Sequence, residues 1–133
     1  MISIINKEIK EENGKYYLEI TLSEYVNDIW KNSYLKSLST KGYTSMYGSG
    51  APTVDKVEIY GNTIRTKTFS KNAKNDVKAF IGELESFIDI TDKIYNAELT
   101  LIKEQEEENR RKQEEKEKVL KDFNDFINND WFN

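Results

Sequence analysis

The residues best suited to a chemical role are large apolar side chains near the C-terminal end of the sequence. They recur at helical spacing and include four aromatic residues within ten positions: Phe123, Phe126, Ile127, Trp131 and Phe132. Aromatic side chains are the commonest anchors of protein interfaces, and an exposed apolar patch usually marks an interaction site. The pattern therefore predicts a surface that binds a protein partner, with a homodimer through the C-terminal helix as its simplest form.

The alternative is that this segment packs against its own chain. Tyr25, Trp30 and Tyr34 could receive it after a chain reversal near residues 103–118. That stretch contains no Gly or Pro, the residues that most readily make such a reversal. Binding to another chain is therefore the favoured interpretation.

A second group of residues has the chemistry to bind a nucleotide or nucleic acid. It consists of aromatic and cationic side chains in a glycine-rich loop, on a β-hairpin and on a charged helix: Tyr43, Tyr47, Lys56, Arg65, Lys67, Arg110 and Arg111. Aromatic rings stack on bases, and arginine binds phosphate or carboxylate groups bidentately. Each part also has a plainer explanation: a flexible crossover, a solvated strand face, and a helix in which Glu neighbours pair the arginines. The plainer explanation is favoured for each part, and nucleotide or nucleic-acid binding stays open as the alternative.

The composition removes most catalytic chemistries. The chain has no Cys and no His, so it lacks thiolate nucleophiles, Cys-ligated metal sites and the commonest general base. It contains no GxSxG, SxxK, HExxH or kinase motif. Carboxylates alone could hold Mg²⁺, but most Asp and Glu residues stand beside Lys in helical patterns, where solvation explains them. We expect a protein that is not an enzyme and that uses no metal or other cofactor.

Charge and hydropathy favour action in the cytoplasm. The net charge of −4 argues weakly against general nucleic-acid binding. A small domain without disulfides fits a reducing cytosol better than secretion. The N-terminal apolar run is broken by Asn6 and Lys7, so it is neither a signal peptide nor an anchor. No stretch approaches the roughly 18 apolar residues that a transmembrane helix needs, and we expect no membrane association.

Two β-hairpins are expected to form one antiparallel sheet. Residues 2–22 alternate apolar and polar side chains around an Asn-Gly turn signal at residues 12–15. Residues 54–69 flank a two-residue turn at Gly61-Asn62. The second turn fixes four facing pairs, the first two on the core side: Ile59 and Ile64, Val57 and Thr66, Glu58 and Arg65, Lys56 and Lys67.

Two helices complete the expected fold. The first runs from about Ser23, whose hydroxyl would cap it, to Leu38. After a long loop at residues 39–53, a second helix begins at about Ala73 and meets no Gly or Pro after Gly82. Its apolar stripe is wide enough to cover one face of the sheet. The stripe consists of Val77, Phe80, Ile81, Leu84, Phe87, Ile88, Thr91, Ile94, Tyr95, Leu101 and Ile102.

Residues 103–118 contain no apolar side chain and predict a solvated helix. Pairs four residues apart, such as Glu106/Arg110 and Glu108/Lys112, each stabilise a helix by about 0.2–0.5 kcal/mol. We therefore divide the chain into a compact α+β domain at residues 1–102 and a charged helical arm at 103–133 that ends in the aromatic segment. The fold class is α+β, with a small antiparallel sheet of two hairpins, one short helix and a long, coiled-coil-like C-terminal helix.

These observations favour a non-enzymatic binding protein. A short, acidic, Lys- and Asn-rich chain without motifs is typical of phages and other mobile elements. The sharpest hypothesis is an inhibitor that blocks a host defence factor by protein–protein contact, as anti-CRISPR proteins do. One alternative is a sponge that sequesters a nucleotide signal or nucleic acid as an oligomer. Another is a phage structural or assembly component.

Overall fold

The first hairpin has the predicted turn. The computed structural model describes residues 1–40 and 51–130. Its sheet begins with β1 (Ile4–Glu12) and β2 (Lys15–Leu22), which pair antiparallel. Asn13 and Gly14 connect the strands with φ angles of 52° and 79°. Two successive positive φ angles are what a tight type I′ turn requires, so the Asn-Gly signal is confirmed.

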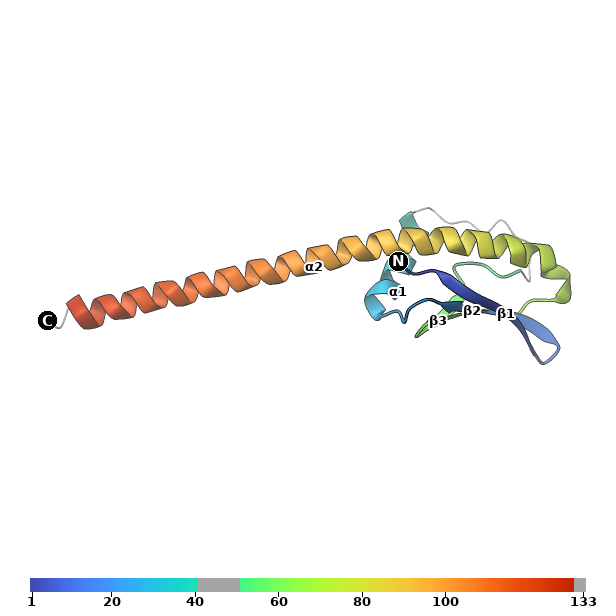
Figure 1. The fold of residues 1–133 in the computed structure, drawn as a ribbon, viewed down its shortest axis with the longest axis horizontal. Helices are drawn as coiled ribbons and strands as arrows, with labels where there is room; N and C mark the ends of the chain where they lie inside the picture. The colour runs from blue at the N-terminus through green and yellow to red at the C-terminus, as the bar shows by residue number, and fades with distance from the viewer. Residues whose placement is uncertain (41–50, 131–133) are drawn as a thin grey trace. The chain divides into compact units, whose positions relative to one another are not determined.

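The second hairpin joins β3 (Val57–Tyr60) to β4 (Thr63–Thr66). Three of the four expected pairs are confirmed: Val57 with Thr66, Glu58 with Arg65, and Ile59 with Ile64. Lys56 and Lys67 lie one residue beyond the strands, outside the ladder of paired residues. β4 also pairs with β2, which gives the strand order β1-β2-β4-β3. The fold is α+β, as predicted (Figure 1).

Gly61 is required by the geometry of the second turn. Its φ is +56°, and a Cβ added there would lie 3.1 Å from two ring carbons of Tyr25. A left-handed conformation costs a residue with a Cβ about 1–2 kcal/mol. We expect Gly61→Ala to lower the free energy of unfolding by at least about that amount in urea titrations. Gly14→Ala is the matched control, because Gly14 has a φ of +79° and open space around it. A smaller effect at Gly61 than at Gly14 would contradict the Tyr25 contact.

Helix α1 (Asp28–Thr40) begins later than predicted, and Ser23 does not cap it. Asn27 takes that role, because its Oδ1 accepts the backbone N–H of Trp30 at 2.9 Å. Ser23 instead continues the pairing of the first hairpin. Its hydroxyl accepts the N–H of Ser3 at 3.0 Å, and its own N–H donates to the Ser3 carbonyl at 2.8 Å. The cap prediction was wrong because the Ser23 hydroxyl forms a hydrogen bond with Ser3 at the end of the strand pair, and the helix begins only at Asp28.

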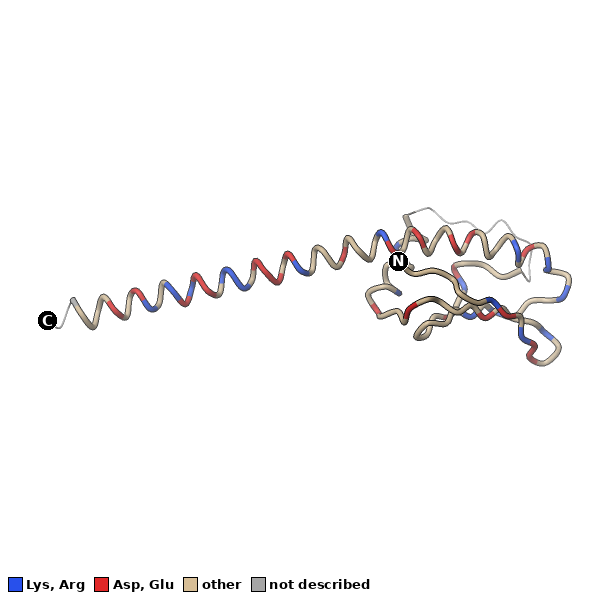
Figure 2. Tube along the Cα trace, in the orientation of Figure 1, with Lys and Arg blue, Asp and Glu red and all other residues tan. Residues whose placement is uncertain are grey.

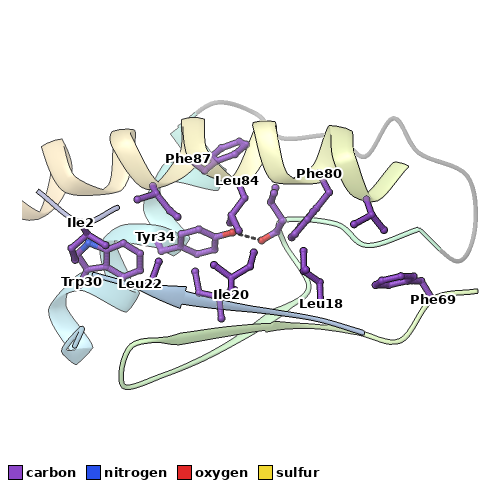
Figure 3. Packing of buried hydrophobic residues seen from close by; sticks show 14 of the residues in the cluster. Ile2, Leu18, Ile20, Leu22, Trp30, Tyr34, Phe69, Phe80, Leu84 and Phe87 are labelled. Atoms are coloured by element: carbon purple, nitrogen blue, oxygen red, sulfur yellow. Dashed lines mark hydrogen bonds between the residues drawn. The ribbon is translucent and has the colours of Figure 1, made fainter. Parts of the chain in front are cut away.

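A short 3₁₀ turn, η1 (Lys71–Ala73), leads into α2 (Lys74–Asp130), one helix of 57 residues. Its first turns lie over one face of the sheet (Figure 1). Figure 3 shows Phe80, Leu84 and Phe87 on the α2 side of a core whose other side is β2. The buried apolar residues of α2 are Val77, Phe80, Leu84, Phe87 and Ile88. Those of β2 are Leu18, Ile20 and Leu22.

The apolar stripe of α2 was predicted too long. Its C-terminal members Leu101 and Ile102 are 61% and 40% exposed, while Tyr95 still packs against the core. Helical periodicity continues past the point where burial ends, and this is why the stripe appeared continuous. By its internal contacts the chain forms two compact units, which we call unit 1 (Met1–Asn96) and unit 2 (Ala97–Asn133).

Within unit 1, α1 contributes stacked rings and hydroxyl groups to the core, and one hydroxyl of α1 lies close to α2. The rings of Trp30 and Tyr34 stack with their centroids 6.0 Å apart. The Tyr34 hydroxyl donates to the carbonyl of Val54 at 2.6 Å, the contact drawn as a dashed line in Figure 3. The Thr91 hydroxyl of α2 donates to the carbonyl of Phe87 at 2.6 Å and lies 3.4 Å from the Ser37 hydroxyl of α1, which donates to the carbonyl of Tyr34 at 2.6 Å. These contacts pair buried polar groups, which would otherwise destabilise the core.

Candidate interaction surface

Unit 2 carries an exposed apolar stripe on the C-terminal part of α2. We call it the distal apolar face and define it as Val119, Leu120, Phe123, Phe126 and Ile127. Their side chains are between 44% and 63% exposed. Spacings of three, four and seven residues place them on one side of the helix. Soluble proteins rarely leave so many large apolar neighbours in water unless the patch binds something.

The distal apolar face follows sixteen residues without an apolar side chain, 103–118. Figure 2 shows cations and carboxylates interspersed along this segment. Lys112 pairs with Glu108 at 3.4 Å, and the side-chain amide of Gln105 donates to Asn109 at 3.1 Å. These contacts are four residues apart and stabilise the helix locally. α2 is helical at every residue of the segment, so the chain reversal that we considered does not occur there.

The two arginines of this segment belong to the solvated helix. Arg110 pairs with Glu114 at 3.9 Å, in an exposed ion pair four residues apart. Arg111 is also exposed. A role of Arg110 and Arg111 in binding an anion stays a prediction. The pairing with Glu114 favours the plainer explanation for Arg110, namely stabilisation of its own helix.

Four of the predicted site residues lie outside the described part of the chain. Trp131 and Phe132 follow the last described residue, and Tyr43 and Tyr47 belong to the segment 41–50. Of the predicted aromatic segment, Phe123, Phe126 and Ile127 are described, and all three belong to the distal apolar face. Val119 and Leu120 were not predicted as site residues, although their helical spacing from Phe123 is a signal that the sequence contains.

The outward face of the sheet holds Arg65 in a set of polar and aromatic contacts. Its guanidinium lies 3.9 Å from the centroid of the Tyr17 ring and pairs with Glu12 at 2.6 Å. Glu19 and Glu58 face Arg65 on the two neighbouring strands. Cation–π stacking and a close carboxylate both hold the guanidinium in place. Arg65 therefore has a structural role on this face.

The other cations of the proposed hairpin face stand at the ends of its two strands. Lys56 and Lys67 are exposed and lie beyond the ends of β3 and β4. Tyr60 donates its hydroxyl to Glu58, and this hydrogen bond raises the pKa of Tyr60 above its ordinary value of 10.0. Nucleic-acid or nucleotide binding by this face stays a prediction, and the carboxylates beside Arg65 weaken its positive charge.

Two hollows at one end of the sheet were not predicted. The first has a volume of 220 Å³ and is lined mainly by apolar atoms, with Tyr16 and Phe69 between β1 and the start of α2. The second, of 610 Å³, adjoins it and shares both of these residues. Tyr16 and Phe69 exchange backbone hydrogen bonds at 3.0 and 2.7 Å. Residue 69 and residue 16 are far apart in sequence, so no local pattern indicated this contact.

A buried carboxylate was missed as well. Asp92 is 5% exposed and accepts two hydrogen bonds. One comes from the backbone N–H of Ile2 at 2.9 Å, and the other from the indole N–H of Trp30 at 3.0 Å. Asp92 thus joins the N-terminal segment, α1 and α2. This arrangement supports the fold, because its two oxygens are occupied by the protein's own donors.

The described residues contain no cluster of three or more acidic side chains placed to hold a metal ion. Over the same part of the chain, no helix combines the length and the apolar character needed to cross a bilayer. No family model, curated protein or solved structure matches the chain. We therefore infer the function from the surface of the described residues.

Proposed function

We propose that this chain is a protein-binding protein that acts through the distal apolar face of α2. The observation that supports the proposal is the exposure of five large apolar side chains on one side of α2, directly after a segment without any apolar side chain. Aromatic residues such as Phe123 and Phe126 are typical anchors of protein interfaces. An apolar helical face of this kind can bind in a groove between two helices, or against the apolar side of one helix.

The size of the face indicates how much it can contribute. Full burial of one such side chain stabilises a complex by about 1.5–3 kcal/mol. The five residues keep roughly half of their surface exposed, so covering them is worth on the order of 5 kcal/mol. Association itself costs about 4–15 kcal/mol. A stable complex therefore needs further contacts along the same helix, beyond the distal apolar face.

Two further parts of the proposal concern the biological setting. We propose that the protein acts in the cytoplasm, and that the process it blocks is a host defence directed against a phage or other mobile element. The composition of the chain supports both of these parts, whereas the described surface supports only the binding role. A sponge for nucleotides and a structural component of a phage remain the alternative functions.

The binding role can be tested with a photo-crosslinking analogue of phenylalanine at position 126. We expect one discrete crosslinked adduct in cells, identified by mass spectrometry, and a decrease of roughly tenfold or more when Phe123→Asp is added. The matched control carries the analogue at position 101, because Leu101 is 61% exposed on the same helix but outside the distal apolar face. Equal adducts at positions 101 and 126, or none at either, would contradict the proposal.

A further inference from the structure

Four of the exposed apolar residues described in unit 2 stand at heptad spacing: Leu99, Ile102, Leu120 and Phe123. Leu99 and Ile102 are 37% and 40% exposed, and they stand 21 residues before Leu120 and Phe123. Twenty-one residues are three heptads, so both patches fall on the same side of a helix that supercoils with a partner. With Leu99 at position a, the core positions from Leu99 to Phe123 are occupied by Leu99, Ile102, Glu106, Asn109, Gln113, Lys116, Leu120 and Phe123.

The core positions between the two patches are polar in a particular order. Glu106 and Gln113 occupy a positions, whereas Asn109 and Lys116 occupy d positions. In an antiparallel coiled coil, each a residue of one helix meets a d residue of the other. An acidic a residue then needs a basic d partner, and an amide needs an amide, because buried polar groups must be paired.

We propose that unit 2 binds unit 2 of a second copy of this chain as an antiparallel coiled coil centred on residue 111. This inference rests on the proposed function and names the partner of the same helix. A residue that precedes position 111 in one copy then meets the residue that follows position 111 by the same number of positions in the other copy. We call each such pair a layer, and each layer occurs twice because the dimer is symmetric. The four layers are Leu99 with Phe123, Ile102 with Leu120, Glu106 with Lys116, and Asn109 with Gln113 of the second copy.

Every layer in this arrangement pairs side chains of matching chemistry. Two layers are apolar, one joins opposite charges and one joins two amides. Within each helix the Asn109 Oδ1 accepts from Gln105, and the Gln113 Nε2 donates to Glu117 at 3.3 Å. The amide N–H of Asn109 and the amide oxygen of Gln113 can therefore pair across the central layer.

Other arrangements of the same two helices place unlike or like-charged groups together. A parallel pair in register would put Glu106 against Glu106 and Lys116 against Lys116 of the second copy. An antiparallel pair moved by one heptad would put Glu106 against Phe123, or Leu99 against Lys116. Each of these layers buries a charge without an opposite charge, which is unfavourable. The pattern of polar residues thus selects both the direction and the centre of the pair.

The cations beside the centre do not oppose this arrangement strongly. Arg110 and Lys112 flank the core positions and would lie near their own copies across the symmetry axis. Each has a carboxylate four residues away in its own helix, Glu114 at 3.9 Å and Glu108 at 3.4 Å. These carboxylates offset much of the repulsion between the two copies. Val119 and Phe126 flank the outer layers and add apolar contact.

Engineered cysteines test the geometry, because the chain has none of its own. We would mix two separately tagged variants, Glu106→Cys and Lys116→Cys, under mild oxidation. The antiparallel arrangement predicts the mixed disulfide. It forbids a disulfide between two copies of the same variant, since those positions are ten residues, or about 15 Å, apart along the axis, and a disulfide spans about 7 Å. Disulfides between two copies of the same variant, without any disulfide between the two different variants, would indicate the parallel arrangement and overturn the inference.

Charge exchange supplies a second readout, the dissociation constant of the dimer from sedimentation equilibrium. Glu106→Lys or Lys116→Glu should each weaken the dimer roughly tenfold or more, because either change creates two like-charged layers. The double variant should recover the affinity of the original chain. Glu104→Lys is the matched control, because Glu104 is an exposed residue of the same helix outside the core positions. If neither single variant weakens the dimer, the Glu106–Lys116 layer is wrong.

The outcomes separate this inference from the proposed function. A discrete adduct from position 126 with a different protein, together with no mixed disulfide and a monomeric mass, would overturn the dimer alone. The absence of both the adduct and the disulfide would overturn the dimer and the proposed binding face together. All substituted positions are exposed on α2, so circular dichroism should show an unchanged helix content in each variant.

Discussion

Replacement of Leu84 by alanine is expected to lower the free energy of unfolding by about 2–5 kcal/mol. Leu84 is fully buried, and Figure 3 shows it between Phe80 and Phe87 on the side of α2 that meets the core. Alanine removes the buried methyl groups and leaves a cavity that close-packed neighbours fill only in part. Small domains are marginally stable, so this loss is a large fraction of the total.

The same substitution elsewhere on α2 provides the control. Leu101→Ala changes the same side chain in the same helix, but Leu101 is 61% exposed and outside the core positions of the proposed dimer. Its effect should remain within about 0.5 kcal/mol. Urea titrations followed by far-ultraviolet circular dichroism, at one fixed protein concentration, measure both. Similar losses for the two variants would show that α2 does not pack on the sheet as described.

The parts of the fold that could be predicted are those that short-range chemistry decides. Asn13-Gly14 and Gly61-Asn62 form two-residue turns, and such a turn fixes the facing residues of both strands. The pairing of β2 with β4 could not be predicted in the same way. It joins Ile20 to Ile64 across the intervening helix and loop, and no local signal selects the strand that a given edge will bind.

The errors in the helices have a common physical cause. Ser23 has the side chain of a good cap, but its hydroxyl is used by the backbone N–H of Ser3, a residue distant in sequence. Leu101 and Ile102 continue the helical spacing of the buried residues before them, although unit 1 ends at Asn96. In both cases the local pattern was correct, and contacts with other elements decided the outcome.

The candidate surface was partly accessible from the sequence for a related reason. A surface on a single exposed helix depends on spacing alone, and the spacing of Phe123, Phe126 and Ile127 predicts a face that is exposed in the structure. Arg65 was singled out for its charge, and its partners Glu12 and Tyr17 come from the other hairpin. Charge in a sequence indicates what a residue can bind, whereas the fold decides what it already binds.

Asp92 is the clearest residue that sequence reasoning could not identify, and its replacement by asparagine should destabilise unit 1. The carboxylate accepts from both Ile2 and Trp30, which stand 90 and 62 residues away in sequence. An asparagine has one oxygen, so its amide NH₂ must face one of these two donors. One buried donor then loses its acceptor, which costs about 1–3 kcal/mol. Asp89→Asn, an exposed carboxylate on the same helix, should cost less than about 0.5 kcal/mol.

A double-mutant cycle with Trp30→Phe can assign this loss to the hydrogen bonds themselves. Phenylalanine removes the indole donor, so an asparagine at position 92 can turn its oxygen toward the N–H of Ile2 and its NH₂ toward the ring. The double variant should therefore be more stable than the sum of the two single losses predicts, by about 0.5–3 kcal/mol in urea titrations. Strict additivity would mean that Trp30 and Asp92 are not coupled. The buried carboxylate would then stabilise unit 1 only through the N-terminal segment, and Ile2 would be its essential partner.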